Sequence, residues 1–338
     1  MRTVFVTGGS GFLGGTLLAA LSERGETVRA LARSETAAAA VAARGAVPVR
    51  GGLDDIDALT AGMRGAELVV HAAARRGGWA AFDALRRVNV DGSRTVLQAA
   101  RSAGVPRLVL ISTEQVVLGD RPLVSADESW PYPERFVGAY AATRAEAEQL
   151  VLAASTPELA TVAVRPRLIW GRGDTVLLPG LTAAVRSGRL RWVDGGGYLT
   201  STTHVRNAVE GVLAAAERGR GGQAYFVTDG APVPFRQFAT DLLATHGIVP
   251  DGGFVSGRVV RAAAGGTGAL WRTLRLPGGP PMDLATVRAV GEECTLRDDR
   301  ARLELGYEGH VTREQGLAEL RSEYTPAAAS PPDPRRGK

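Results

Sequence analysis

The stretch that decides the fold reads Thr3-Val4-Phe5-Val6-Thr7-Gly8-Gly9-Ser10-Gly11-Phe12-Leu13-Gly14. Its first five residues are rich in β-branched and aromatic side chains, which favour a strand, and residues 13–24 are typical of a helix. In the turn between them, Gly8 permits a tight bend, Gly11 lets the backbone approach a pyrophosphate, and Gly14 lets the helix pack closely on the strand. The helix N-terminus then presents unpaired N–H groups and the positive end of its dipole to the phosphates. We therefore predict a dinucleotide site with Gly8, Gly11, Phe12, Leu13 and Gly14 in contact with the cofactor.

Strands and helices alternate along the first half of the chain. Short β-rich runs are separated by longer stretches of helical periodicity, a pattern typical of parallel sheets with right-handed crossovers. The predicted strands are 3–7, 27–32, 46–49, 67–71, 107–112 and 160–165, and the predicted helices are 13–24, 56–63, 82–103 and 138–154. The predicted fold class is therefore α/β, a Rossmann doubly wound parallel sheet.

The alternation weakens after about residue 170, where glycine and proline become frequent. We expect this part to form a smaller C-terminal substrate lobe over the carboxyl edge of the sheet, where open α/β folds bind ligands. The predicted NAD(P)-binding domain spans 1–170, with 200–228 returning to it, and the lobe comprises 171–199 and 229–324. Residues 325–338 have the composition of a disordered tail.

The composition excludes several classes of protein. The single cysteine, Cys294, cannot form an internal disulfide, and the four histidines do not cluster at metal-ligand spacing. The start of the chain lacks the pattern of a signal peptide, and no apolar run reaches the roughly 18 residues of a membrane span. We expect a cytoplasmic protein with no metal and no integral membrane segment.

The basic residues do not predict a nucleic-acid partner. The chain has 40 basic residues, of which only Lys338 is a lysine, and its formal net charge is only +5. The arginines are scattered, often beside acids as in Glu23-Arg24, and aromatic residues make up only 6%. A nucleic-acid surface would need a clustered basic face with stacking aromatics, so we expect none.

Several further motifs follow the opening stretch in order. They are Val70-His71-Ala72-Ala73-Ala74, Asn89-Val90-Asp91-Gly92-Ser93, Arg165-Pro166-Arg167-Leu168-Ile169-Trp170-Gly171 and Thr203-His204-Val205-Arg206-Asn207. Together they resemble the extended short-chain dehydrogenase/reductase superfamily, of the NAD-dependent epimerase/dehydratase type, out to about residue 320. Thr113-Glu114 through Asp127-Glu128-Ser129-Trp130-Pro131 looks closest to the 3β-hydroxysteroid dehydrogenase-like branch.

The resemblance implies further cofactor contacts at the ends of the later strands. They involve His71, Ala72, Ala73, Asn89, Ser112 and Pro166. An acidic residue ending the second strand would bind the ribose of NAD, whereas an arginine there accommodates the 2′-phosphate of NADP. Ala32 is followed by Arg33 in this chain, which favours NADP(H), with NAD(H) possible. Where the family often has Gly-Asp-Leu at the adenine, this chain has Gly51-Gly52-Leu53, and Asp54 is expected to substitute.

The resemblance also implies a catalytic set of Ser/Thr, Tyr and Lys, with the last two four residues apart on one helix. Tyr140 occupies the tyrosine position as general acid/base, but Arg144 replaces the lysine that holds the nicotinamide ribose. The position of the hydroxyl, five residues before Gly119, is occupied by Glu114. Three interpretations stay open: Thr113 serves through a shifted loop, the Glu114 carboxyl group replaces the hydroxyl, or Glu114 forms an ion pair with Arg144.

We predict an oxidoreductase that transfers a hydride between the nicotinamide and a ketone or secondary alcohol of an apolar or small molecule. One alternative is a nucleotide-sugar epimerase or dehydratase, and another is an NADP(H)-binding protein whose catalysis is lost or altered. The loop Arg75-Arg76-Gly77-Gly78-Trp79 could line the substrate entrance. Residues 255–276 could form a lid, a membrane-surface helix or an ordinary packed segment, in which Gly265-Gly266 would interrupt a long helix. The resemblance further implies a possible homodimer.

Overall fold

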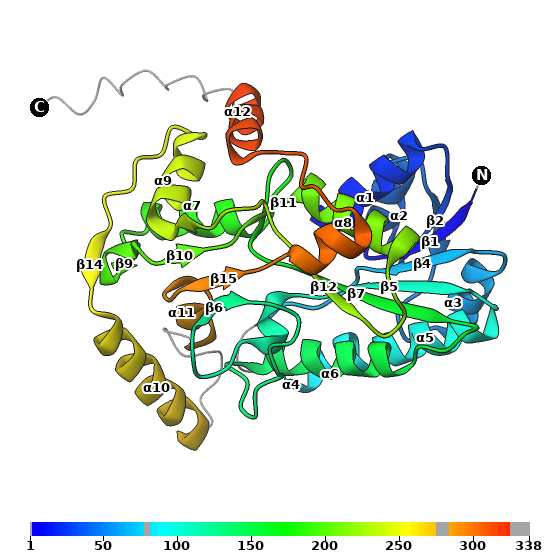
Figure 1. Ribbon diagram of the computed structural model, residues 1–338, viewed down its shortest axis with the longest axis horizontal. Helices are drawn as coiled ribbons and strands as arrows, with labels where there is room; N and C mark the ends of the chain where they lie inside the picture. Colours follow the sequence, from blue (N-terminus) through cyan, green and yellow to red (C-terminus); the bar gives the residue numbers. More distant parts are fainter. Residues whose placement is uncertain (1, 78–81, 275–283, 325–338) are drawn as a thin grey trace, which may run out of the picture.

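The computed structural model describes residues 2–77, 82–274 and 284–324, and its central feature is a seven-stranded sheet (Figure 1). All neighbouring strands pair in parallel. In spatial order they are β12 (Ala224–Val227), β7 (Ala160–Pro166), β5 (Arg107–Ile111), β4 (Leu68–His71), β1 (Thr3–Thr7), β2 (Thr27–Ala32) and β3 (Val47–Arg50). The chain starts at β1, proceeds outward to β3 and crosses back to β4, so the order reverses between β1 and β4. The predicted Rossmann sheet is confirmed.

Helices cover both faces of this sheet, because strands such as β1 carry apolar side chains on both sides. Val4 and Val6 point into one apolar cluster, whereas Phe5 between them points into the other. The first cluster is closed by α1 (Phe12–Glu23), α2 (Glu35–Ala42) and α8 (Val205–Arg218). The second is closed by α3 (Ile56–Met63), α5 (Gly92–Ser102) and α6 (Ala139–Ala153). Helix α2 was not predicted because its run of alanines has no apolar periodicity.

The predicted helix 82–103 forms as one helical run with a defect in its middle. Helix α4 (Phe82–Arg86) passes through a π-helical turn, Arg87–Asp91, into α5. A π turn inserts a residue into the helical ladder and is frequent at functional sites. This one turns the buried side chain of Asn89 inward.

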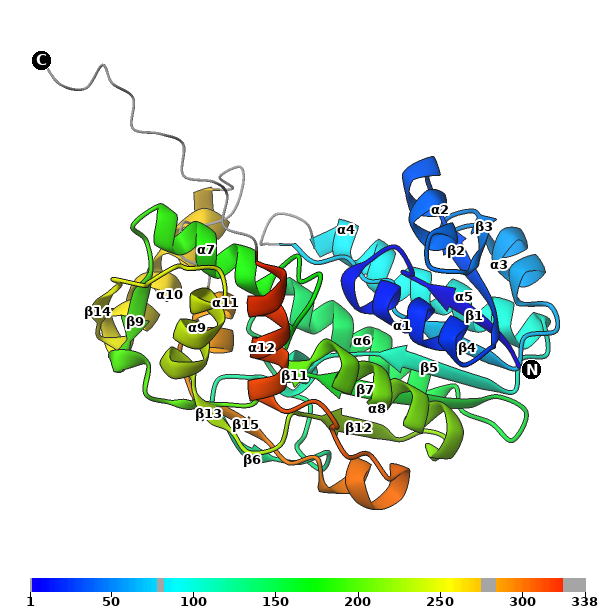
Figure 2. The ribbon, with the colours of Figure 1, turned by 90° about the horizontal axis from the view of Figure 1, so that it is seen from above.

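The remaining elements gather into a smaller lobe at the end of the sheet, to the left in Figure 1. A four-stranded sheet contains β13 (Val233–Pro234), β10 (Leu199–Thr200), β15 (Cys294–Leu296) and β6 (Leu123–Ala126). Two strand pairs join β8 (Ile169–Trp170) to β11 (Thr203–His204), and β9 (Arg191–Val193) to β14 (Gly253–Val255). The helices of this part of the chain are α7 (Leu177–Arg186), α9 (Phe235–Ala244), α10 (Gly257–Leu274), α11 (Leu284–Val290) and α12 (Arg313–Glu323). Helix α12 lies between the lobe and the main sheet in Figure 2.

Helix α10 corrects one expectation. It continues without a break through Gly265-Gly266, although this pair was expected to interrupt a long helix. Each glycine costs a helix about 1 kcal/mol relative to alanine. Packing of Val260 and Ala264 against Val287 of α11 offsets this cost. No helix of the described ranges is long and apolar enough to cross a bilayer. Gly78 and Trp79 of the proposed entrance loop, and the predicted tail 325–338, lie outside the described residues.

Candidate active site

The predicted cofactor residues lie along one edge of the main sheet. Because all seven strands are parallel, their carboxyl ends meet at this edge, on both sides of the switch point. The residues found there are Gly8 to Gly14 after β1, Arg33 after β2, Asp54 after β3, His71 to Ala73 at the end of β4, Ser112 after β5 and Pro166 at the end of β7. Arg33 and Asp54 are exposed, whereas Pro166 is buried.

The glycine loop is shaped by contacts that no other residue permits. Gly8 has a φ of +76°, and a Cβ there would lie 2.6 Å from the backbone nitrogen of Ala73. A Cβ on Gly14 would lie 2.1 Å from the Gly8 carbonyl oxygen. Gly11 is the N-cap of α1 and provides no side-chain cap, so the first N–H groups of the helix remain available to a ligand. An uncapped helix end with no Cβ in front of it fits a pyrophosphate.

Phe12 and Leu13 form the first turn of α1, and both are partly buried. Leu13 packs against the apolar cluster below the helix. Phe12 lies toward Gly173, beyond the end of β8, since its ring is 3.7 Å from the position of a Cβ there. The two side chains therefore connect the cofactor loop to the core and to the loop after β8.

A polarised chain of hydrogen bonds joins β1 to β4 below the loop. Ser93 donates from its hydroxyl to the Asn89 carbonyl at 2.6 Å, so its oxygen accepts from Nε2–H of His71 at 2.9 Å. Nδ1 of His71 then accepts from the Thr7 hydroxyl at 2.7 Å. Burial, reinforced by the positive charge of Arg144, lowers the pKa of His71 to about 3. The imidazole is neutral and engaged at both nitrogens, which leaves the backbone of this strand end to face a cofactor.

Asn89 connects the cofactor strand to the helix that carries Tyr140. Its Oδ1 accepts from the Arg75 backbone N–H at 2.8 Å, and its Nδ2 donates to the Arg75 carbonyl at 3.1 Å. The same Nδ2 donates to Thr143 Oγ1 at 3.1 Å, and the Thr143 hydroxyl donates to the Tyr140 carbonyl. One buried amide therefore holds both the loop after β4 and the first turn of α6.

Tyr140 and Arg144 are successive members of the inward face of α6. Tyr140 is half-buried in the first turn, and the side chain of Arg144 is buried one turn later. Arg144 Nη2 donates to the Ile111 carbonyl at the end of β5, but its Nε and Nη1 have no hydrogen-bond partner in the described structure. The hydroxyl of Ser112, the residue after Ile111, is also buried without a partner. Unpaired buried polar atoms cost about 1–3 kcal/mol each, so this cluster fits a ligand that supplies hydroxyl groups, such as a ribose.

Glu148 lies one further turn along α6 and anchors the helix to the sheet. Its carboxylate accepts from Arg165 of β7 through Nη2 at 2.6 Å and through Nε at 3.0 Å, and it accepts from the Tyr132 hydroxyl at 2.7 Å. Burial and the Glu148 charge raise the pKa of Tyr132. The inward face of α6 is thus tied to β5 through Arg144 and to β7 through Glu148.

Glu114 does not pair with Arg144, so that interpretation was wrong. The Glu114 carboxylate, 3% exposed, accepts from Arg167 Nη1 at 2.7 Å and from the Thr113 hydroxyl at 2.7 Å. Arg167 in turn donates from Nε and Nη2 to Thr200 Oγ1 of β10. The reason is direction: Arg144 extends toward the Ile111 carbonyl, whereas Glu114 starts a 3₁₀ turn that faces the lobe.

The sequence motif that contains Arg167 did not indicate a role for this residue. The available signal was an arginine directly beyond the end of a buried strand, where a charge has to find a partner.

The described residues offer neither a metal site nor a reactive thiol. They contain no group of three or more metal-ligating side chains. Burial raises the pKa of the Cys294 thiol to about 12, so it is not a nucleophile near neutral pH.

Comparison with known proteins agrees with this geometry. The sequence matches the 3-beta hydroxysteroid dehydrogenase/isomerase family over residues 5–254. It is 53% identical to a 4-hydroxy-2-methyl-3-oxo-4-farnesyl-3,4-dihydroquinoline-1-oxide ketoreductase from Stigmatella aurantiaca, across 95% of this chain and 96% of that protein. It is 39% identical to a 2-alkyl-3-oxoalkanoate reductase from Stenotrophomonas maltophilia, across 94% of this chain and 98% of that protein.

Solved structures agree on the fold. A dTDP-glucose 4,6-dehydratase from Streptomyces venezuelae, with NAD and TYD bound, superposes with a TM-score of 0.74 at 24% identity, across 95% of this chain and 96% of that chain. The predicted superfamily, its branch and the enzyme class are therefore confirmed. The chain belongs to the 3-beta hydroxysteroid dehydrogenase/isomerase family and is an NAD(P)-dependent oxidoreductase that interconverts a ketone and a secondary alcohol.

Proposed function

We propose that the chain is an NADP(H)-dependent reductase of an apolar ketone, with Tyr140 as the proton donor. The observation that carries the proposal is the inward face of α6, where Tyr140 is followed one turn later by Arg144. Arg144 has two unpartnered donors and binds the carbonyl of Ile111, directly before Ser112. The names of the two relatives support a ketone joined to an apolar chain, since one substrate carries a farnesyl group and the other an alkyl group.

Each residue of this face has a distinct task in the proposed reaction. When bound, the nicotinamide cofactor would supply the hydride that the carbonyl carbon needs. Tyr140 donates its phenolic proton to the carbonyl oxygen, so that the product is the neutral alcohol and the tyrosine becomes a phenolate. Arg144, which is permanently charged, stabilises that phenolate and holds the ribose hydroxyls with Nε and Nη1. It cannot pass on a proton as a lysine might, so the phenolate is reprotonated by another route.

The Ser/Thr hydroxyl of the family's catalytic set comes from a different residue in this proposal. Thr113 gives its only hydroxyl proton to Glu114, and both oxygens of Glu114 are occupied. Neither side chain therefore has a donor to offer a substrate carbonyl. Ser112 has an uncommitted hydroxyl at the end of β5, and we assign the role of orienting donor to it.

The preference for NADP(H) rests on Arg33. The residue directly follows the last residue of β2, is exposed, and precedes Ser34, which caps α2. A guanidinium at this position can pair with a 2′-phosphate, whereas a carboxylate would repel it. NAD(H) stays the alternative cofactor.

The rest of the arrangement completes the proposal. Residues 171–199 and 229–324, joined by β6 of the four-stranded sheet, would form the lobe that encloses the substrate, while the rest of 1–170 and 200–228 would bind the cofactor. A homodimer is supported by the family resemblance, and sedimentation velocity would test it. A cytoplasmic location is supported by the single cysteine of the sequence.

Two substitutions on α6 test the proposed function. Tyr140→Phe should lower kcat by at least about 100-fold, because the proton donor is lost, and should leave the Kd for NADPH unchanged. Arg144→Lys should retain turnover but weaken NADPH binding, since one ammonium replaces two aligned donors. The measurements are NADPH oxidation at 340 nm over a panel of alkyl-substituted ketones, and NADPH fluorescence titration.

The outcomes separate chemistry from binding. Equal turnover of wild type and Tyr140→Phe would refute the role of Tyr140. An Arg144→Lys variant that binds NADPH as tightly as wild type would refute the ribose contact. Gln149→Leu, an exposed position on the same helix, is the matched control and should change neither quantity.

A further inference from the structure

An apolar surface stands out at the far end of the lobe, around β14 and the start of α10. Val249 is 83% exposed, Phe254 66% and Val259 61%. Among the large hydrophobic side chains of the described residues, Leu303 is the most exposed, at 86%, and these three come next. Three of the four most exposed apolar side chains therefore lie within an eleven-residue stretch. We call Val249, Phe254 and Val259 the apolar tip.

The chain around the apolar tip is basic. From Leu242 to Thr267 the sequence contains one acid, Asp251, and two arginines, Arg258 and Arg261. Arg258 is exposed, next to Val259 on α10. Strand β9 pairs with β14 and adds the exposed Arg191, whose side chain lies against Gly253. The guanidinium of Arg236 lies over the Phe254 ring at 5.1 Å.

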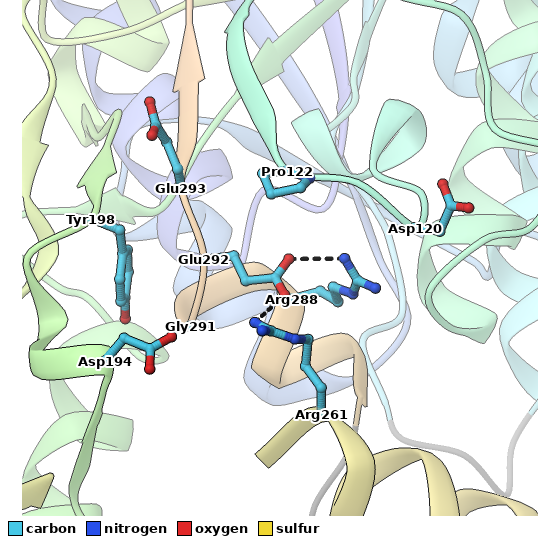
Figure 3. A pocket seen from close by; sticks show the side chains of 9 residues that line it. All are labelled: Asp120, Pro122, Asp194, Tyr198, Arg261, Arg288, Gly291, Glu292 and Glu293. Carbon is cyan, nitrogen blue, oxygen red and sulfur yellow. Dashed lines mark hydrogen bonds and ion pairs between the residues drawn. The ribbon is translucent and has the colours of Figure 1, made fainter. Parts of the chain in front are cut away.

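The start of α10 is anchored on its inner side, where Figure 3 shows Arg261 and Arg288 directed at Glu292. Asp194 Oδ1 accepts from the Gly257 backbone N–H at 2.8 Å and so fixes the first residue of the helix. Glu292, almost fully buried, accepts from Arg261 of α10 at 3.0 Å and from Arg288 of α11 at 2.9 Å. These side chains line a pocket of about 480 Å³ on the inner side of α10. The buried residues Val260 and Ala264 face inward, so the helix has no freedom to turn Val259 away from solvent.

The outward face of α10 contains no acid in its described part. Its exposed residues are Arg258, Val259, Ala262, Ala263, Gly265, Gly266 and Thr273. A helix anchored on one side, with an apolar and basic outward face, is the arrangement of helices that lie in the headgroup region of a bilayer. Arginines beside the apolar side chains are attracted to anionic headgroups over about one Debye length.

We propose that the apolar tip and its arginines dock the protein reversibly on an anionic lipid surface. Phe254 and Val259 enter the headgroup layer, while Arg191, Arg236 and Arg258 face lipid phosphates. A second copy of the chain fits this surface less well, because a two-fold contact would place these arginines against themselves. The docking does not depend on the proposed reaction, so either can fail without the other.

The test is co-sedimentation of the full-length protein with vesicles. Wild type should pellet with vesicles of phosphatidylcholine and phosphatidylglycerol, much less with phosphatidylcholine alone, and should be released by high salt. The double substitution Phe254→Ser with Val259→Ser should weaken binding at least about tenfold, because two apolar side chains no longer leave water. Leu303→Ser removes an equally exposed apolar side chain elsewhere and should leave binding unchanged.

A second pair of variants tests the contribution of the arginines to vesicle binding. Arg258→Gln should weaken vesicle binding about fivefold, whereas Arg64→Gln, at an exposed arginine after α3, should not. NADPH titration and circular dichroism check that each variant is folded. No pelleting of wild type, equal pelleting with uncharged vesicles, or equal binding by the double variant would each overturn the proposal. A vesicle-independent dimer that Val259→Ser dissociates would assign the surface to a second copy instead.

Discussion

Glu114 is a buried charged side chain whose hydrogen-bond partners, Arg167 and Thr113, belong to the protein itself. Arg167, fully buried on the other side of the ion pair, has Glu114 as its charged partner and Thr200 as a further acceptor. A carboxylate held by a guanidinium and a hydroxyl is an acceptor, and it has no proton to give to a substrate. The residue at the family's hydroxyl position therefore connects the end of β5 to the lobe.

This role leads to a prediction for two neighbouring residues. Glu114→Gln should lower the free energy of unfolding by about 3 kcal/mol, because it removes the negative charge of a buried ion pair with Arg167. Ser112→Ala should leave that free energy nearly unchanged but lower kcat about 100-fold, as expected when an orienting donor is lost. Urea unfolding and NADPH oxidation measure the two effects. The reverse pattern, with Glu114→Gln inactive at full stability, would make Glu114 the catalytic group.

Arg33 is the residue on which the choice of cofactor depends. Arg33→Ala should weaken NADPH binding by about 10-fold to 100-fold, the loss of one charge-assisted contact, and should change NADH binding by less than about twofold. Fluorescence titration with both cofactors gives the ratio. Arg64→Ala, at another exposed arginine, is the control. An equal loss for NADPH and NADH would show that Arg33 does not contact the 2′-phosphate.

Helix α6 is held by buried side-chain contacts along its length. Its inward residues reach three different partners: the π-helical turn through Thr143, β5 through Arg144 and β7 through Glu148. The spacing of Tyr140, Arg144 and Glu148 is four residues, so all three share one face of the helix. The helix is thereby fixed along its axis as well as in rotation, which holds Tyr140 at the carboxyl edge of the sheet.

The glycine loop gives a prediction at the scale of an element. Gly14→Ala should destabilise the protein by about 3 kcal/mol or more, because the added Cβ would lie 2.1 Å from the Gly8 carbonyl oxygen, which is backbone and cannot yield. Gly11→Ala should fold normally, since its nearest neighbour would be at 3.4 Å. It should nevertheless weaken NADPH binding, because the methyl group stands before the helix N-terminus.

Urea unfolding and NADPH titration distinguish the two positions. A Gly14→Ala variant as stable as wild type would contradict the prediction. It would show that the glycine loop can move away from the added methyl group. A Gly11→Ala variant that binds NADPH as tightly as wild type would mean that the pyrophosphate does not approach this end of α1.

The whole molecule is built around buried polar groups that must keep one protonation state. Burial lowers the pKa of His71 to about 3 and that of His204 to about 4, both below the ordinary value of 6.5. His71 lies inside the main sheet, whereas His204 caps α8 and packs edge-on against Trp170 at 4.9 Å. Both regions of the molecule are therefore stable only while these rings are neutral.

Stability should consequently fall as the solution becomes acidic. Between about pH 6.5 and 5 the unfolded chain binds a proton on each of these histidines and the folded chain does not. Each therefore removes up to about 1.4 kcal/mol per pH unit, and the contribution is complete above pH 6.5. His204→Asn keeps a capping acceptor for α8 and should roughly halve this slope. Urea midpoints from pH 5 to 7.5 measure it, and a flat profile for wild type would contradict the neutral histidines.

The sequence alone determined the nucleotide-binding half of the protein. The order of the first strands and the glycine turn depend on local propensity and short residue spacing, whereas the family resemblance implied the positions of Tyr140 and Arg144. Such short-range patterns are readable because a strand, a turn or a helix face is specified by neighbours in the chain. The ordered series of motifs, through its resemblance to a known family, indicated the family and the enzyme class.

Only the tertiary structure decided which charges meet. Glu114 is paired with Arg167, 53 residues away, rather than with Arg144, and Asn89 spans from the loop after β4 to α6. The continuity of α10 through two glycines likewise depended on packing against α11. These outcomes are set by the directions in which distant elements approach one another, and periodicity along the chain does not encode them. The physical reason is that a buried charge takes the partner that the fold brings within hydrogen-bond distance, wherever that partner lies in the sequence.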